Sequence, residues 1–156
     1  FARYPDLALN WGIDLLNTLT YNLPNVFKTI HICNGYPQYL DQEDYLKADY
    51  NKLKEIIIKL DKSNINAISI EDAHCNQNLE YIKDIKNKTI VFGVIAICKS
   101  KIETVYEIKN RINEILKYIP KERLIIAPDC GLGFLEENIL VQKLKNMVES
   151  VKHFNL

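Results

Sequence analysis

The stretch RLIIAPDCG at residues 123–131 combines the features on which both the fold and the site depend. It opens with a short continuous apolar run, which is typical of a strand in the buried interior of a parallel sheet. Pro128 to Gly131 then end the strand with polar and turn-forming residues. The following residues, 138–154, have apolar side chains at helical spacing. We therefore predict a strand followed by a helix.

The same unit recurs along the chain. Three further apolar runs predict strands at residues 26–33, 66–71 and 89–97. Amphipathic patterns predict further helices at residues 7–19, 43–62, 79–87 and 102–119. This alternation indicates the α/β class, with about four parallel strands each followed by a helix.

Composition limits the classes of function. The chain has 156 residues, of which 47% are hydrophobic, and this suits one domain with one core. Lys and Arg together number 20, as do Asp and Glu, so the net charge favours neither a nucleic-acid partner nor an anionic membrane surface. The longest apolar runs are too short to cross a bilayer, and no basic segment with an adjoining apolar stretch opens the chain. We expect a cytoplasmic protein without a membrane or nucleic-acid partner.

The cysteines and the first residues suggest two further expectations. Four cysteines in a neutral chain of this size are expected to be reduced thiols or metal ligands rather than disulfides. The chain begins at Phe1, its single methionine is Met147, and FARYPDLALNWG resembles the middle of a protein. We therefore expect a fragment or a late domain of a longer polypeptide.

Reactive side chains are concentrated where the predicted strands end. His31 and Cys33 end the first strand, Glu71 the second and Cys130 the fourth. Side chains two residues apart on a strand point to the same side, so His31 and Cys33 share a face. The carboxyl ends of parallel strands meet at one edge, where α/β folds bind their ligands. Imidazole, thiolate and carboxylate are all ligands of Zn²⁺, so a zinc site is the functional hypothesis.

Structural explanations stay open for each residue taken singly. Free cysteines are often buried as small hydrophobic residues, His31 can be a hydrogen-bonded core histidine, and Glu71 can be the partner of a buried cation. His74 follows Glu71 closely and is expected either in solvent or beside the ligands. Asp129 precedes Cys130 and is expected either to orient a ligand or to accept hydrogen bonds from loop amides.

Three motifs together resemble a known family. IHICNGYP, AISIEDAHC and LIIAPDCGLG, in this order and at these separations, are similar to the carboxyl-terminal catalytic barrel of cobalamin-independent methionine synthases and their archaeal-type relatives. The resemblance extends from about Phe1 to Phe154. It implies that residues 1–156 are a partial catalytic domain, the second half of a TIM barrel whose upstream strands are missing. The zinc ligands implied by the motifs are His31, Cys33, Glu71 and Cys130.

The resemblance also implies a chemistry and partners. Family members transfer a methyl group from 5-methyltetrahydropteroyl(tri)glutamate to homocysteine, which gives methionine. The implied partners are homocysteine or another small thiol, a methylated folate or other methyl donor, and the missing barrel half or a second copy. Zinc suits this reaction because a free thiol, with a pKa of about 8.5, is mostly protonated at neutral pH and only the thiolate is a good nucleophile.

One motif departs from the family pattern. Ala96-Ile97-Cys98-Lys99 stands where typical members have Asp-Ile-His-Ser, so no catalytic acid or base is assigned and the pterin donor stays open. We expect Cys98 not to be a metal ligand. HICNG replaces the typical His-x-Cys-Tyr and is similar to a branch that includes enzymes acting on coenzyme M thioethers. That activity, as a lyase or transferase, and a non-catalytic zinc-binding fragment are the alternative functions.

Overall fold

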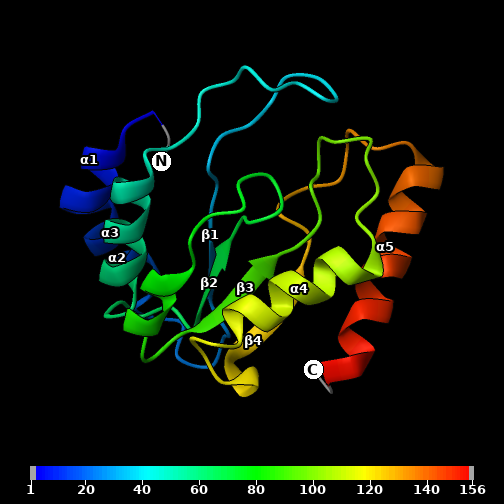
Figure 1. Ribbon diagram of the computed structural model, residues 1–156. Helices are drawn as coiled ribbons and strands as arrows, with labels where there is room; N and C mark the ends of the chain where they lie inside the picture. Colours follow the sequence, from blue (N-terminus) through cyan, green and yellow to red (C-terminus); the bar gives the residue numbers. More distant parts are fainter. Residues whose placement is uncertain (1–2, 155–156) are drawn as a thin grey trace.

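The fold is a single sheet of four parallel strands with helices packed against it (Figure 1). The computed structural model describes residues 3–154, so both ends of the predicted domain 1–156 lie outside the described residues. The strands are β1 (Thr29–Ile32), β2 (Ala67–Ile70), β3 (Thr89–Gly93) and β4 (Leu124–Ala127). Neighbouring strands are parallel and follow the order of the chain. This confirms the predicted α/β class with four parallel strands, and the sequential order is that of successive units in a barrel wall.

Helical segments precede and follow the strands. The chain enters through α1 (Pro5–Leu7), the π-helical η1 (Ala8–Gly12) and α2 (Ile13–Thr20). The strands are followed in turn by α3 (Tyr50–Leu60), the 3₁₀-helical η2 (Glu80–Asp84), α4 (Val105–Ile115) and α5 (Glu137–Val151). Two more 3₁₀ turns are η3 (Lys121–Arg123) and η4 (Lys152–Phe154). Within residues 3–154 no helix has the length and apolar character needed to cross a membrane.

Three predicted elements differ from the observed ones. The helix predicted from residue 43 begins only at Tyr50, where the Asp49 side chain caps it by accepting hydrogen bonds from the amides of Asn51 and Lys52 at 2.8 and 3.0 Å. The helix predicted at residues 79–87 is a single 3₁₀ segment. The strand predicted to reach residue 97 ends at Gly93, because the apolar residues that follow it form a buried loop rather than strand pairs.

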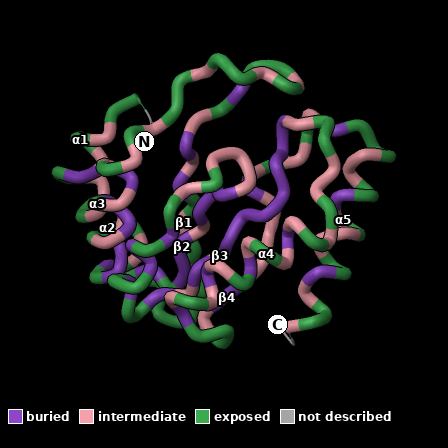
Figure 2. Tube along the Cα trace, viewed as in Figure 1, coloured by how far each residue is buried: buried purple, intermediate pink, exposed green. Residues whose placement is uncertain are grey.

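The core lies between the sheet and the helices packed on it, and Figure 2 shows buried residues following the strands. Fully buried core side chains include Leu53, Ile57, Ile68, Ile82, Ile90 and Phe92. The α4 helix adds Ile108, Ile112 and Ile115 to this layer, at the spacing that places side chains on one helix face. This packing makes the strands a rigid support for the residues at their carboxyl ends.

The α4 helix begins at a reciprocal cap. Glu107 donates its amide to Thr104 Oγ1 at 3.2 Å, and its Oε2 accepts the Thr104 amide at 2.8 Å. Lys101 Nζ lies 2.7 Å from Glu107 Oε1. The Lys101 ammonium and the Thr104 donors together lower the pKa of Glu107 to about 2. The cap therefore fixes where the loop after β3 turns into α4.

Candidate metal centre

Three side chains converge at the carboxyl ends of the strands. His31, Glu71 and Cys130 each offer one ligand atom, and these atoms lie within 4.8 Å of one another. His31 lies on β1, Glu71 directly follows β2, and Cys130 follows β4. His31 Nε2 is 3.3 Å from Glu71 Oε1. Nitrogen, oxygen and sulfur donors at this spacing fit a zinc ion, which takes all three kinds of ligand.

Cys33, the fourth predicted ligand, lies beside this group without belonging to it. Its Sγ donates a hydrogen bond to the carbonyl of Gly35 at 3.4 Å. Burial raises the pKa of the Cys33 thiol to about 11, and the nearby Glu71 and Cys130 raise it as well. A thiol with such a pKa is protonated at neutral pH, and a metal ion that binds to its sulfur would displace the proton.

The Glu71 carboxylate is oriented by Asn34, which follows the neighbouring strand β1. Glu71 Oε2 accepts a hydrogen bond from the Asn34 amide at 2.9 Å, and Asn34 Nδ2 donates to the Glu71 carbonyl at 3.4 Å. Both residues are buried. Since the protein holds Oε2, the other oxygen, Oε1, is directed at His31. The turn after Asn34 requires glycine, because Gly35 has φ +139° and a Cβ there would lie 2.2 Å from the Leu46 carbonyl oxygen.

The imidazole of His31 is oriented by the register of the sheet. His31 pairs with Ser69 of β2, and its Nδ1 lies 3.0 Å from Ser69 Oγ. This contact leaves Nε2 directed toward Glu71. Sequence reasoning missed both Asn34 and Ser69, although Asn34 directly follows the His-x-Cys motif and Ser69 lies two residues before Glu71 on the same strand face.

Asp129 connects two of the loops that carry these groups. Its Oδ1 accepts hydrogen bonds from the amides of Asp72 and Ala73, each at 3.1 Å. Its Oδ2 accepts the His74 amide at 2.9 Å and lies 2.8 Å from His74 Nδ1. Both side chains are buried, so His74 is not in solvent. Since Asp129 directly precedes Cys130, these bonds fix the Cys130 loop against the loop after β2.

A long loop crosses the same end of the molecule. Residues 33–49 connect β1 with α3 (cyan in Figure 1). Cys98 Sγ donates to the Tyr39 carbonyl at 2.9 Å, and the Cys98 carbonyl accepts the Asp41 amide at 2.8 Å. Asp41 also accepts hydrogen bonds from the amide and hydroxyl of Ser100. Cys98 thus contacts this loop and lies outside the group of three converging side chains.

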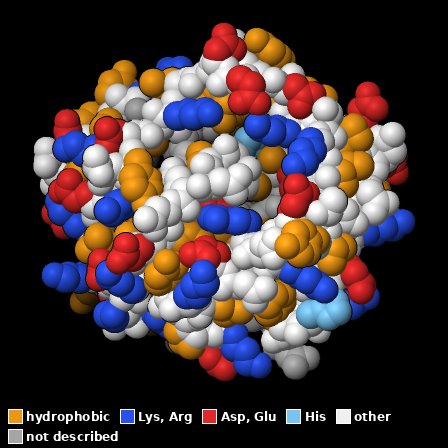
Figure 3. Space-filling view, in the orientation of Figure 1, with side chains coloured by type: hydrophobic (Ala, Val, Ile, Leu, Met, Phe, Trp, Pro, Cys, Tyr) orange, Lys and Arg blue, Asp and Glu red, His pale blue; other side chains and the backbone are white. Residues whose placement is uncertain are grey.

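The charges around the site are mixed. Figure 3 shows Lys and Arg interspersed with Asp and Glu over this face of the molecule. A cavity of about 350 Å³ lies between the loops after β2 and β3 and α4, and charged side chains line it. Arg111 makes a paired contact with buried Asp72, with both N–O distances 2.6 Å, and Lys101 is paired with Glu107. These lining charges are paired with one another.

Comparisons with known proteins show what this chain is similar to. Residues 45–153 match the family profile described as cobalamin-independent synthase, catalytic domain. The methionine synthase of Thermococcus kodakarensis is 34% identical over 124 residues, which cover 79% of this chain and 32% of that protein. The methionine synthase of Sulfurisphaera tokodaii is 34% identical over 146 residues, covering 92% of this chain and 38% of that protein. The chain therefore spans about a third of the length of these relatives.

A solved structure extends the similarity to almost the whole fold. The B12-independent methionine synthase from Shewanella sp., determined in complex with selenomethionine, matches with a TM-score of 0.84 and 25% identity. The match covers 99% of this chain and 46% of that chain. It confirms that the four parallel strands belong to a TIM-barrel family. Since the profile also covers most of its length, this chain belongs to the cobalamin-independent synthases, as part of their catalytic domain.

Proposed function

We propose that this chain is the metal-binding part of a methionine synthase that methylates homocysteine. The observation that carries the proposal is the convergence of His31, Glu71 and Cys130 within 4.8 Å, with Cys33 beside them. A methylated folate is the proposed methyl donor, because relatives that match most of this chain are named methionine synthases.

The donor set suits zinc. His31 Nε2, Glu71 Oε1 and the thiolates of Cys33 and Cys130 would hold the ion. Zinc supplies a Lewis acid, which lowers the pKa of a thiol so that it is a thiolate at neutral pH. The chain's own contribution is orientation, because Asn34 and Ser69 fix the carboxylate and the imidazole before any ligand arrives.

We also propose that further strands complete the barrel, either from the missing half or from a second copy. The strands β1 and β4 are the two edges of the sheet, and a closed barrel has none. The helical segment before β1 exposes an apolar stripe, with Leu7, Trp11, Leu15 and Leu19 between 44% and 70% exposed. At the other edge, α5 exposes Val141 and Val148. In a complete barrel, neighbouring units would cover these faces.

A cytoplasmic location fits the chemistry that we propose. All four cysteines are free thiols, and two of them are proposed ligands. Reducing compartments keep such thiols available for metal and substrate.

Methyl transfer measured with and without the upstream half tests the function. The zinc-loaded chain is assayed with methylated tetrahydrofolate and either homocysteine or coenzyme M, alone and with the upstream segment of the Thermococcus kodakarensis relative. We expect methionine formation only in the combined sample, because orientation of both substrates supplies much of the rate. Methyl transfer to coenzyme M but not to homocysteine would favour a relative that acts on coenzyme M, and zinc binding without turnover by any combination would favour a non-catalytic role.

A further inference from the structure

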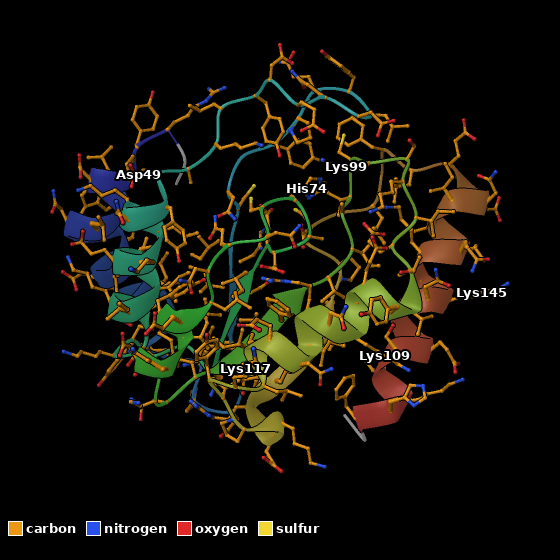
Figure 4. All side chains as sticks on the ribbon, in the orientation of Figure 1. Asp49, His74, Lys99, Lys109, Lys117 and Lys145 are labelled. Carbon is orange, nitrogen blue, oxygen red and sulfur yellow. The ribbon has the colours of Figure 1, made fainter. Side chains whose placement is uncertain are left out.

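We propose that His74 is a positioning residue of the candidate metal centre. Its imidazole braces the three loops that follow β2, β3 and β4, and so sets the separation between Glu71 and Cys130. This inference rests on the proposed function, because it assigns His74 a role toward the proposed zinc ligands. His74 lies where these loops meet, close to the loop that carries Lys99 (Figure 4).

Hydrogen bonds fix the tautomer of His74. The Cys98 amide donates to Nε2 at 3.4 Å, so Nε2 carries no proton. Nδ1 therefore carries the hydrogen and donates it to Asp129 Oδ2, at 2.8 Å. The side chain is 6% exposed, so water hardly competes for either bond. A ring with both nitrogens engaged in this way is neither a metal ligand nor a free proton carrier.

The two contacts of the ring join loops that carry ligands. His74 lies three residues beyond Glu71, on the loop after β2. Its partner Asp129 is the residue before Cys130, on the loop after β4. The ring therefore connects the backbone near Glu71 with the backbone near Cys130. At the Cys130 end, the connection passes through the Asp129 side chain to the next residue in the chain. A shift of Asp129 would move Cys130 relative to Glu71.

Backbone amides do not make the ring redundant. The amides of Asp72 and Ala73 both donate to Asp129 Oδ1. The other oxygen, Oδ2, has the His74 amide and the His74 ring as its donors. Without the ring, the buried Asp129 carboxylate loses one of its hydrogen-bond donors. Hydrogen bonds to an ionised acceptor are among the strong ones, so this loss is costly.

The segment that contacts His74 Nε2 is itself held by hydrogen bonds and an ion pair. The Ala96 amide donates to Glu103 Oε1 at 2.9 Å, and the Ala96 carbonyl accepts from Lys143 Nζ at 3.1 Å. Lys143 is fully buried and lies 3.0 Å from Glu103 Oε2. These contacts fix the segment that presents the Cys98 amide, and they tie it to α5. The Cys98 amide is therefore held in place, so its contact with Nε2 can fix the position of the His74 ring.

Two substitutions separate the hydrogen bond from the shape of the ring. In His74→Asn the amide nitrogen stands as many bonds from Cα as Nδ1, so the donor to Asp129 is retained. In His74→Leu the shape is similar and the donor is lost. Zinc affinity is measured by competition with a chromophoric chelator, and the geometry by the absorption bands of Co²⁺ in place of Zn²⁺. We expect His74→Leu to bind zinc at least about 10-fold more weakly with altered Co²⁺ bands. His74→Asn, which keeps the donor to Asp129 but loses the acceptor for the Cys98 amide, is expected to lie between His74→Leu and the wild type.

A matched control removes general loss of stability as an explanation. Asp61 is a buried carboxylate that accepts the amides of Lys86 and Asn87 at the other end of the strands. Asp61→Asn is expected to lower the melting temperature without changing zinc affinity or the Co²⁺ spectrum. If His74→Leu does not fold, His74→Gln replaces it, since its amide reaches the Nε2 position and not that of Nδ1.

The outcomes distinguish this inference from the proposed function. Wild-type zinc affinity and Co²⁺ bands in His74→Leu would overturn the positioning role and leave the metal centre standing. Equal losses in the Asn and Leu variants would also overturn it, because the hydrogen bond to Asp129 would then not matter. A wild-type chain that binds no zinc would overturn both proposals.

Discussion

A Cβ atom at Gly93 would lie 2.2 Å from Asp129 Oδ1 and 2.7 Å from Asp129 Cα. Gly93 is the last residue of β3, and the Asp129 side chain occupies the space that a larger residue would fill. The requirement for glycine here is spatial, since only Gly35 among the described glycines has a positive φ. Because Gly93 has no side chain, Asp129 can pack against β3, and this contact helps to position the loop before Cys130.

Gly93→Ala tests this relationship. The added methyl group must displace Asp129, and overpacking of this kind typically lowers the free energy of unfolding by about 1–3 kcal/mol. Denaturant unfolding measures the loss. Gly133→Ala is the control, because a Cβ there meets no atom within 4 Å. Equal stability of the two variants would contradict the packing that we describe.

Asp129→Asn is expected to weaken both the fold and the metal site. The amide that replaces Oδ1 or Oδ2 would face N–H donors that need an acceptor, and a buried donor without a partner costs about 1–3 kcal/mol. Zinc affinity should fall about 10-fold or more, because the bonds that hold the Cys130 loop are lost. Unfolding and zinc titration check the two effects. An Asp129→Asn variant with unchanged zinc affinity would show that this loop does not determine the site.

Replacing the buried cation of α5 should be strongly destabilising. Lys143→Met leaves the Glu103 carboxylate, whose side chain is 15% exposed, without its positive partner. Breaking a buried ion pair in this way typically costs about 3–5 kcal/mol. The double variant Lys143→Met, Glu103→Gln should recover part of this loss, because no unpaired charge remains. Chemical unfolding is measured for the wild type, the single variant and the double variant. A Lys143→Met variant as stable as the wild type would refute the stabilising role of the ion pair.

The cap of α4 predicts a pH-dependent stability. Because the folded-state pKa of Glu107 is lowered to about 2, its contribution is full above its ordinary pKa of 4.5 and is lost as pH falls toward 2. Glu107→Gln keeps the reciprocal cap but removes the charge that pairs with Lys101 and favours the first turn of α4, so it should lower stability at pH 7 by about 0.3–1 kcal/mol. The difference from wild type should shrink between pH 4.5 and 2.

Thermal unfolding across this pH range checks the expected trend. Glu149→Gln serves as the control, because Glu149 has its lowered pKa from exposed Lys152 and makes no helix cap. Its effect should be small at every pH, as is usual for exposed ion pairs. A Glu107→Gln deficit that grew on acidification would have the wrong sign for the proposed cap.

The strands were predictable because short apolar runs bounded by polar residues are a strong local signal, as in residues 123–131. The same signal failed after Gly93, where Val94 to Ile97 are apolar because they are buried in a loop, and burial alone does not define a strand. The helix predicted from residue 43 failed because Leu46, an apolar residue in the expected pattern, is 60% exposed on a loop.

Part of the candidate site was predictable for the same reason. His31, Glu71 and Cys130 are reactive residue types directly at predicted strand ends, and the topology brings such ends together. Asn34 and Ser69 were not found, because their contacts depend on the register of β1 against β2 and on a turn at Gly35. Residue type alone carries no such information.

The zinc content of the chain and its cysteine variants tests the proposed metal centre most directly. Protein purified with zinc and freed of loosely bound metal is analysed by atomic emission, together with Cys98→Ala and the double variant Cys33→Ser, Cys130→Ser. We expect about one zinc per chain in the wild type and in Cys98→Ala, and none in the double variant. Full zinc occupancy in the double variant, or loss of the metal from Cys98→Ala, would contradict the proposed ligand set.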